Sequence, residues 1–249
     1  MNKPESCLTF RIAVYCFAFA IVLCGLYFLF LLAVPRRADF TVRMSDGQIA
    51  DKPQVIIDAG HGGRDGGAAG VTGLVEKDLN LEIAALLNDM LCATGIQTRM
   101  TRSVDSLVCD ESDPALRGRL KQTDLKNRVA LAEANPDALF LSIHMNNFPV
   151  EKYSGLQVYY SPHAESSRSL AACIQENTSA LLQPDNTRKI KAAGSNIFLL
   201  DRIRTTAVLV ECGFLSNRAE SAQLANAEYR KKLALVLAVS VLQNLCEPA

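Results

Sequence analysis

The stretch VIIDAGHGGRDGGA, residues 55–68, decides how the rest of the chain is interpreted. It begins with a compact apolar run that predicts a buried strand over residues 54–59, and a histidine and five glycines within eight residues follow. A glycine-rich turn after a buried strand can bind a phosphate, can present its histidine to a metal, or can simply turn the chain. The remainder of the sequence must decide between these interpretations.

The phosphate interpretation fails on residue identity. The dinucleotide fingerprint G-x-G-x-x-G, begun at Gly60, needs a third glycine at position 65, where the chain has Asp65. The Walker pattern fails as well, because Gly62 and Gly67 have the required separation but Ala68 stands where the lysine must be. No predicted helix begins directly after the loop to offer its N-terminus to an anion. A phosphate-binding α/β protein therefore remains only a minor alternative.

Strands and helices are predicted to alternate beyond this loop. Apolar runs predict strands at 54–59, 96–100, 138–144, 156–161, 196–200 and 207–211. Helical spacing predicts helices at about 78–94, 124–135, 164–182 and 226–245, and a polar stretch predicts a long surface loop at 103–123. Because the strands are apolar throughout, they indicate an α/β domain with a mostly parallel sheet of about six strands, flanked by helices on both faces.

The N-terminal part of the chain differs from the rest, because residues 12–34 carry no charge. A helix of this length, at about 1.5 Å per residue, can cross a hydrocarbon core of about 30 Å. A cleavable signal peptide usually has a shorter apolar region and an A-x-A-like site, which this segment lacks. We therefore predict an uncleaved signal-anchor with a transmembrane helix in residues 1–35, a linker at 36–53 and one catalytic domain at 54–249. Basic residues on both sides of the span nearly cancel, so they do not settle its orientation.

Composition narrows the function classes. Lysine plus arginine equal aspartate plus glutamate at 26 each, so no basic excess favours nucleic acid as a partner. The eight cysteines include no C-x-x-C pair and are mostly far apart, which argues against a disulfide framework and a thiolate zinc site. We interpret them mostly as small buried hydrophobic residues.

Three titratable side chains stand at the carboxyl ends of predicted strands. His61 follows the first strand, and His144 and Glu211 each end a later one. Ligands of open α/β sheets bind beyond the carboxyl ends of the strands, and burying such side chains without partners is costly. Two imidazoles and a carboxylate, with one position left open, suit a hydrolytic zinc site. His163, the remaining histidine, is interpreted as a surface residue.

The identity of the carboxylate ligand stays open at this point. Glu211 is one candidate. Glu76 is the other, because it lies just before a predicted helix, 15 residues after His61, and can fold back toward the strand end. An acid in the first turn of a helix is also favoured by the helix dipole alone, so Glu76 has an ordinary structural explanation as well.

Six segments then match a known family when they are taken together and in order: VIIDAGHGGRDGGA, GLVEKDLNL, TRMTRSVD, DLKNRV, LFLSIHMNN and AVLVECGFLSN. As a set they resemble the zinc-dependent N-acetylmuramoyl-L-alanine amidases of the amidase type 3 family. The resemblance covers about residues 54–245. A single domain behind an N-terminal anchor, without wall-binding repeats, is most similar to the germination-specific cortex amidases of spore-forming bacteria.

The resemblance implies a role for each candidate residue. In the family, the histidine of DAGHGG, the glutamate of EKD and the histidine of SIH bind one zinc ion, and they correspond to His61, Glu76 and His144. The glutamate of VLVE is catalytic in the family and corresponds to Glu211. The family's fold is a twisted, mostly parallel sheet flanked by helices, in agreement with the strand and helix pattern.

Four further residues of these motifs are expected to support the site. Asp58, Asn80, Arg128 and Ser142 are expected to be structural or to orient the ligands, since metal-bound histidines usually donate their other ring N–H to a carboxylate or carbonyl. The turn Gly213–Asn217 is expected either to line the substrate cleft or simply to connect a strand to a helix.

The implied reaction is zinc-assisted hydrolysis of the amide bond between the lactyl group of N-acetylmuramic acid and the L-alanine of the stem peptide. The expected partners are peptidoglycan and, through the N-terminal helix, a membrane, with the domain outside the cytoplasm; the sequence does not show whether an accessory protein is needed. Two alternatives remain: a zinc peptidase that cuts within the stem peptide, and a non-catalytic wall-binding protein.

Overall fold

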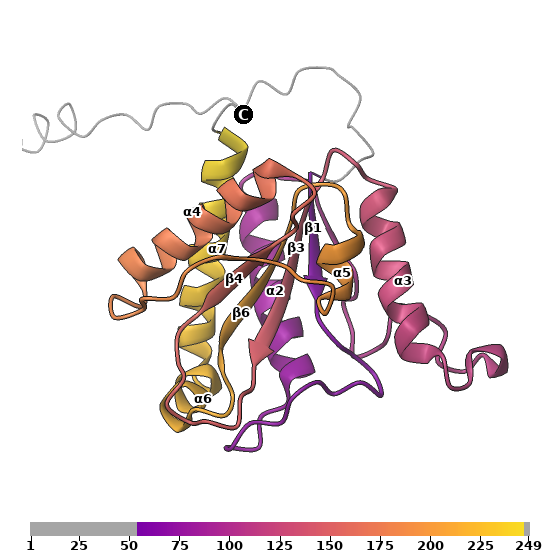
Figure 1. Ribbon diagram of the computed structural model, residues 1–249, viewed down its shortest axis with the longest axis horizontal. Coiled ribbons are helices and arrows are strands. Elements are labelled where there is room, and N and C mark those ends of the chain that lie inside the picture. Colours follow the sequence, from indigo (N-terminus) through magenta and orange to yellow (C-terminus); the bar gives the residue numbers. More distant parts are fainter. Residues whose placement is uncertain (1–53, 247–249) are drawn as a thin grey trace, which may run out of the picture. The chain divides into compact units, whose positions relative to one another are not determined.

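The apolar run that opens the domain forms a strand in the interior of a six-stranded sheet (Figure 1). The structure is a computed structural model and describes residues 54–246. The strands are β1 (Val55–Ala59), β2 (Thr98–Met100), β3 (Leu139–Asn146), β4 (Gln157–Tyr160), β5 (Lys191–Ala192) and β6 (Ala207–Phe214). Their order across the sheet is β2-β1-β3-β6-β4-β5, and every pairing is parallel except that of β4 with β6. The predicted mostly parallel sheet is therefore confirmed.

Helices cover both faces of this sheet (Figure 1). One face packs against α2 (Glu76–Ala93), α4 (Glu165–Leu181) and α7 (Ala227–Cys246), and the other lies under α3 (Leu120–Glu133) and α5 (Phe198–Arg202). The short α6 (Arg218–Ala225) follows β6, and a 3-10 turn, η1 (Pro114–Leu116), precedes α3. Each face has its own apolar core, which explains why the strands are apolar throughout.

Alternation along β6 decides which way the site faces. Val208 and Val210 lie in the core beneath α2, α4 and α7, whereas Leu209 lies in the core beneath α3 and α5. Successive side chains of a strand point to opposite faces, so Glu211 lies on the same face as Leu209. His144 is the register partner of Glu211 on β3 and shares this face.

Helix α2 follows directly from its sequence. Leu79, Ile83, Leu87 and Leu91 recur every four residues and are all buried, which gives the helix one apolar face against the sheet. Gly95 follows the end of the helix with a φ of 85°, a left-handed conformation that glycine adopts without steric cost.

Two of the predicted elements were wrong. Residues 196–200 were predicted as a strand, but Phe198–Arg202 form α5, and the sixth strand is Lys191–Ala192 instead. A short apolar run fits a buried helical turn as well as a strand, and Leu199 and Leu200 are both buried here. The predicted loop at 103–123 contains η1 and the first turn of α3.

The predicted fold class also needs a correction at its membrane helix. Between residues 54 and 246, no helix is long and apolar enough to cross a membrane. The fold class that the structure supports is an α/β domain with a six-stranded, mostly parallel sheet and flanking helices. The predicted span within residues 1–35 and the linker at 36–53 lie outside the described residues.

The cysteines were only partly predicted. In the described part of the chain, Cys92, Cys109, Cys212 and Cys246 have free thiols. Only Cys212 is buried, however, while Cys92 and Cys246 are exposed. The interpretation as buried hydrophobic residues was therefore wrong for most of them.

Candidate functional site

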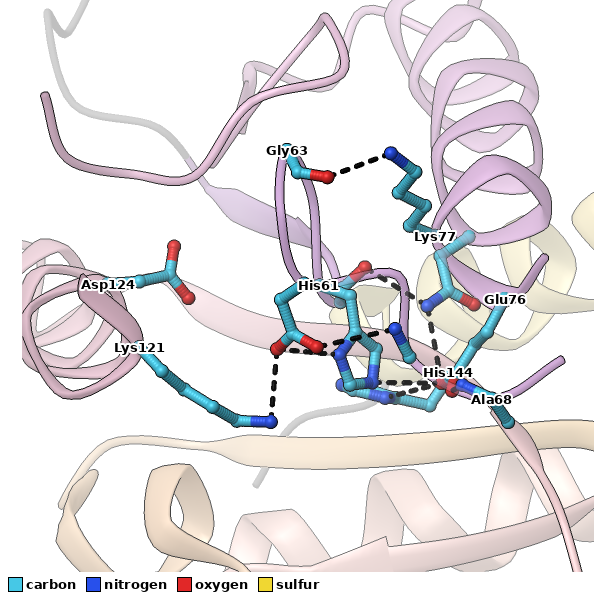
Figure 2. Close-up of polar contacts among 12 residues, drawn as sticks. His61, Gly63, Ala68, Glu76, Lys77, Lys121, Asp124 and His144 are labelled. Atoms are coloured by element: carbon cyan, nitrogen blue, oxygen red, sulfur yellow. Dashed lines mark hydrogen bonds and ion pairs between the residues drawn. The ribbon is translucent and has the colours of Figure 1, made fainter. Parts of the chain in front are cut away.

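Three of the predicted site residues converge at the carboxyl ends of β1 and β3 (Figure 2). His61 lies in the loop after β1, Glu76 is the first residue of α2, and His144 lies in β3. One ligand atom from each lies within 4.8 Å of the others. Glu76 Oε1 lies 2.9 Å from His144 Nδ1 and 3.3 Å from His61 Nε2. Segments distant in sequence thus bring two imidazoles and one carboxylate to one point.

Glu76 is held as a carboxylate by its surroundings. The N–H of Ala68 donates to Oε2 at 2.8 Å, and the N–H of Met145 donates to Oε1 at 3.1 Å. Burial alone would raise the pKa of Glu76, but the hydrogen bonds and charges of His144 and His61 hold it well below its usual range. The ordinary explanation of Glu76 as a first-turn acid therefore does not describe its position, because the side chain folds back between two histidines.

The backbone at His61 is strained. Its φ is 62°, an uncommon value for a residue other than glycine. On the side of the ring away from Glu76, Nδ1 lies 3.0 Å from Asp65 Oδ2, and this carboxylate is also paired with Lys121 at 3.1 Å. Burial lowers the pKa of His61, but Glu76 and then Asp65 raise it above its usual value. This arrangement places Nε2 toward the cluster and Nδ1 beside Asp65.

Sequence reasoning missed the role of Asp65, which entered it only as the residue that breaks a dinucleotide fingerprint. An acid four residues after a proposed metal-binding histidine in the same loop was the signal that could have identified it.

The glycines of the loop allow the ligands to approach its backbone. A Cβ at Gly60 would collide with the ring of His144. A Cβ at Gly67 would lie 2.5 Å from Glu76 Oε2, and its φ of 68° is one that other residues adopt only with strain. The glycines therefore let the backbone of the loop lie directly beside His144 and Glu76. This is consistent with the interpretation in which the loop presents its histidine to a metal.

A buried ion pair between Arg128 and Asp58 supports the loop that carries His61. Arg128 Nη1 donates to Asp58 Oδ1 at 2.6 Å, and both residues are fully or almost fully buried. Ser142 Oγ donates to the other oxygen of Asp58 at 2.6 Å, and Arg128 Nη2 donates to the carbonyl of His61 at 2.8 Å. Burial raises the pKa of Asp58, but Arg128 and then Ser142 lower it below its usual value. The network holds the strained residue in place through its backbone.

A second buried arginine, which the sequence analysis did not single out, binds the same loop. Arg102 donates to the carbonyls of Ala59 at 2.9 Å and Gly60 at 3.1 Å. Asn80 Nδ2 also donates to the carbonyl of Gly60, at 3.1 Å. The motif residues expected to have supporting roles thus contact the backbone of the loop and Asp58, and Asn80 Nδ2 also donates to Glu76 Oε1 at 3.4 Å.

Glu211 stands next to this cluster but is not part of it. It lies on β6 opposite His144. Its Oε2 is buried and has no hydrogen-bond partner among the described residues. Burial raises the pKa of Glu211 to about 7, the charge of Glu76 adds to the rise, and the two histidines oppose it. Such a carboxyl can both bind and release a proton near neutral pH.

The two remaining expectations concern the periphery. His163 is exposed and contacts the carbonyl of Asp201 at 2.9 Å and Arg204 at 2.8 Å, as expected of a surface residue. In the turn after β6, Asn217 caps α6 by accepting the N–H of Glu220 at 3.0 Å. Phe214 lines a cavity of about 260 Å³ over β4 and β6. The turn therefore both connects two elements and borders a cavity.

Comparison with known proteins gives a consistent result. The family model described as N-acetylmuramoyl-L-alanine amidase matches residues 55–243. The chain is 36% identical over 194 residues to the germination-specific N-acetylmuramoyl-L-alanine amidase of Bacillus subtilis, an alignment that covers 78% of this chain and 80% of that protein.

Solved structures agree. The CwlD amidase from Clostridioides difficile, determined in complex with the GerS lipoprotein, has a TM-score of 0.72 and 35% identity, over 77% of this chain and 97% of that one. The N-acetylmuramoyl-L-alanine amidase AmiC2 of Nostoc punctiforme has a TM-score of 0.65 and 31% identity, over 78% of this chain and 97% of that one. On the family match, the relatives and the geometry of the site, the chain belongs to the N-acetylmuramoyl-L-alanine amidases of the amidase type 3 family and is a hydrolase of that class.

Proposed function

We propose that this amidase is zinc-dependent, that His61, Glu76 and His144 hold the zinc ion, and that Glu211 moves the protons of the reaction. The bond cleaved is the amide between the lactyl group of N-acetylmuramic acid and the L-alanine of the stem peptide. The observation that carries the proposal is the convergence of three donors within 4.8 Å, next to a buried carboxylate oxygen that has no hydrogen-bond partner among the described residues.

The donor set fits zinc. Two imidazole nitrogens and one carboxylate oxygen are the protein ligands of many hydrolytic zinc sites, whereas magnesium and calcium prefer oxygen donors throughout. Glu76 is ionised at neutral pH because its pKa is lowered. The contact between its Oε1 and the two histidines gives three groups one common focus. A cation bound here would contact the carboxylate of Glu76, which two histidine rings and two backbone N–H groups already hold in place.

Each residue then has a separate task. Zinc, when bound, lowers the pKa of water and polarises the scissile carbonyl. Glu211 accepts a proton from the attacking water and delivers it to the nitrogen of L-alanine as the amide bond breaks. Its pKa of about 7 suits both transfers, because neither the ionised nor the neutral form is strongly disfavoured near neutral pH. Asp65 holds the ring of His61 from the opposite side.

The biological setting is part of the proposal. The similarity to a germination-specific amidase supports a role in spore cortex peptidoglycan, and residues 54–249 form the catalytic domain. The substrate places this domain outside the cytoplasm. A lipoprotein partner is supported by the CwlD amidase, which was solved with the GerS lipoprotein.

The test is mass spectrometry of peptidoglycan fragments after digestion by the full chain with zinc. We expect stem peptides that carry a free L-alanine amine, and far fewer of them in the same time with Glu211→Gln. Cuts within the stem peptide would instead establish a zinc peptidase. Binding to peptidoglycan without any cleavage, in the presence of zinc and the partner lipoprotein, would establish a wall-binding protein and contradict the proposal.

A further inference from the structure

The sheet face that carries Glu211 continues into a cavity that the proposed chemistry does not use. Gln157 on β4 is the register partner of Glu211, and Tyr159 is the partner of Leu209. Residues directly opposite each other in an antiparallel pair point to the same face. His144, Glu211 and Gln157 therefore form a row across β3, β6 and β4, and the cavity lies at the end of this row.

This cavity of about 260 Å³, which we name the Arg188 pocket, combines aromatic and cationic side chains. Its lining includes Phe148, Tyr153, Gln157, Arg188, Lys191 and Phe214. The rings of Phe148 and Tyr153 lie edge to face with centroids 5.1 Å apart. Both residues are at least 40% exposed, so their rings are accessible to a ligand in the pocket.

Arg188 is held in place by neutral partners. Its Nε donates to the carbonyl of Ser154 at 2.6 Å, its Nη1 donates to Gln157 Oε1 at 2.8 Å, and its guanidinium lies 4.4 Å from the centre of the Phe214 ring. Within the described part of the chain it forms no ion pair, and Nη2 donates no hydrogen bond to a described residue. Its planar fork is thus oriented before any anion arrives.

Lys191 adds a second cation without a partner. It is exposed on β5 and lines the same pocket, and its side chain forms no ion pair or hydrogen bond with another described residue. Glu220, a buried carboxylate near Arg188, already accepts the backbone N–H groups of Gly155 and Phe214, each at 2.8 Å. The two positive charges at the pocket are therefore available to a ligand.

At the opposite end of the row the cations already have carboxylate partners. Beyond His61, Lys121, Lys77 and Arg64 are paired with Asp65, Asp105 and Glu111. An anionic portion of the substrate is therefore favoured over β4 and β5, where Arg188 and Lys191 have no ion-pair partner among the described residues. On the leaving side of the scissile amide, the stem peptide carries free carboxylates after its L-alanine, whereas the glycan on the other side is uncharged at this position.

We infer that the Arg188 pocket binds a stem-peptide carboxylate on the leaving side of the scissile bond and makes the enzyme select substrates in which this carboxylate is free. The inference rests on the proposed function for the identity of the reaction. Arg188 supplies the N–H donors of Nη2, Lys191 supplies a second charge, and the aromatic wall covers the peptide backbone.

The test compares two muramoyl peptides that differ only in whether the stem-peptide carboxylates are free or amidated, with the full chain and zinc. We expect kcat/KM for the free carboxylate to exceed that for the amide by roughly tenfold. Lys191→Gln and Arg188→Gln should lower this ratio by reducing turnover of the free acid alone. The matched control is Lys189→Gln, which removes an exposed lysine of the same run that lines a different cavity and should keep the ratio.

Turnover of the amidated compound reports whether each variant is folded. A ratio near one in the wild type, or a ratio unchanged in both Arg188→Gln and Lys191→Gln, would overturn the inference. If the wild type hydrolyses neither compound, the proposed function is contradicted instead. The pocket is then tested by titrating free stem peptide: binding that is roughly tenfold weaker in Lys191→Gln than in Lys189→Gln supports it, and equal binding overturns it.

Discussion

The β1–β3 side of the site and the β6 side place the same chemical group in opposite surroundings. On the β1–β3 side, Glu76 has two histidines and two backbone N–H groups around its carboxylate, and its pKa lies well below the usual range. On the β6 side, one oxygen of Glu211 is buried with no hydrogen-bond partner among the described residues, and its pKa is raised to about 7. One glutamate is therefore suited to hold a cation and the other to exchange protons.

The largest effect is expected when only the glutamate on the β6 side, Glu211, is neutralised. Glu211→Gln keeps the size of the side chain and removes its ability to take a proton. We expect kcat to fall by about 10²- to 10⁴-fold, the range of general acid–base contributions, while the zinc content of the protein stays at that of the wild type. Enzyme assay and metal analysis of the same sample measure both quantities. Loss of zinc from this variant would show that Glu211 is a ligand.

Neutralising the β1–β3 side should give the opposite pattern. Glu76→Gln removes the negative charge that both histidines contact, so we expect zinc to be lost on dialysis and the activity to be lost with it. High zinc concentrations should restore part of the activity of Glu76→Gln and none of that of Glu211→Gln. Equal responses of the two variants to added zinc would remove the distinction between them.

The buried support of the β1–β3 side should contribute to stability. Arg128→Met leaves Asp58 buried without its cation, and removing one partner of such a pair costs about 3–5 kcal/mol of unfolding free energy. The control is Arg168→Met, which breaks an exposed pair with Glu165 and should change stability little. Denaturant unfolding of the full chain measures both. Similar midpoints for the two variants would contradict the structural role of Arg128.

The outer contact of His61 should have a smaller effect. Asp65→Asn removes the charge beside Nδ1 and leaves the three proposed ligands in place. Losing such a partner typically lowers metal affinity by about 10- to 100-fold. Competition with a chelator measures the affinity, and Asp105→Asn, which loses only an ion pair with Lys77 and a backbone contact, serves as the control. Unchanged affinity would show that the ring of His61 is held by its backbone alone.

The smallest expected effect comes from the glycine beneath Glu76. Gly67→Ala places a methyl group 2.5 Å from Glu76 Oε2, whereas Gly73→Ala meets nothing within 4 Å although both residues have positive φ. Both substitutions therefore place a side chain on backbone with a positive φ, and only that at Gly67 also collides with Glu76. We expect weaker zinc binding in Gly67→Ala alone, measured by the same chelator competition. Equal affinities would mean that the loop shifts without disturbing the cluster.

The sequence predicted much of the β1–β3 side because strand ends in a parallel sheet meet at one edge. His61, His144 and Glu211 were identified from the ends of three apolar runs, and the structure brings them to the same face. Glu76 could not be decided in this way, since its place at the start of a helix had an ordinary explanation. Only the family resemblance favoured it as a ligand, and the structure shows its side chain folded back between the histidines.

The Arg188 pocket could not be predicted, for a physical reason. Its two cations, Arg188 and Lys191, lie on a chain segment whose path is set by tertiary contacts, such as the hydrogen bonds from Asn186 Nδ2 to the carbonyl of Leu156 and from Arg188 to that of Ser154. Such contacts produce no periodic apolar pattern from which they could be predicted. The two-residue strand β5 was missed for the same reason, because its residues are exposed and lack a strand pattern.

Zinc content and release of the L-alanine amine, measured together on wild type, Glu76→Gln and Glu211→Gln, test the division of labour between the two glutamates most directly. We predict that the wild type has both, that Glu211→Gln keeps zinc and releases the amine about 10²- to 10⁴-fold more slowly, and that Glu76→Gln has neither until zinc is added in excess. A Glu211→Gln enzyme as active as the wild type, or a Glu76→Gln enzyme that retains zinc as firmly as the wild type, would contradict it.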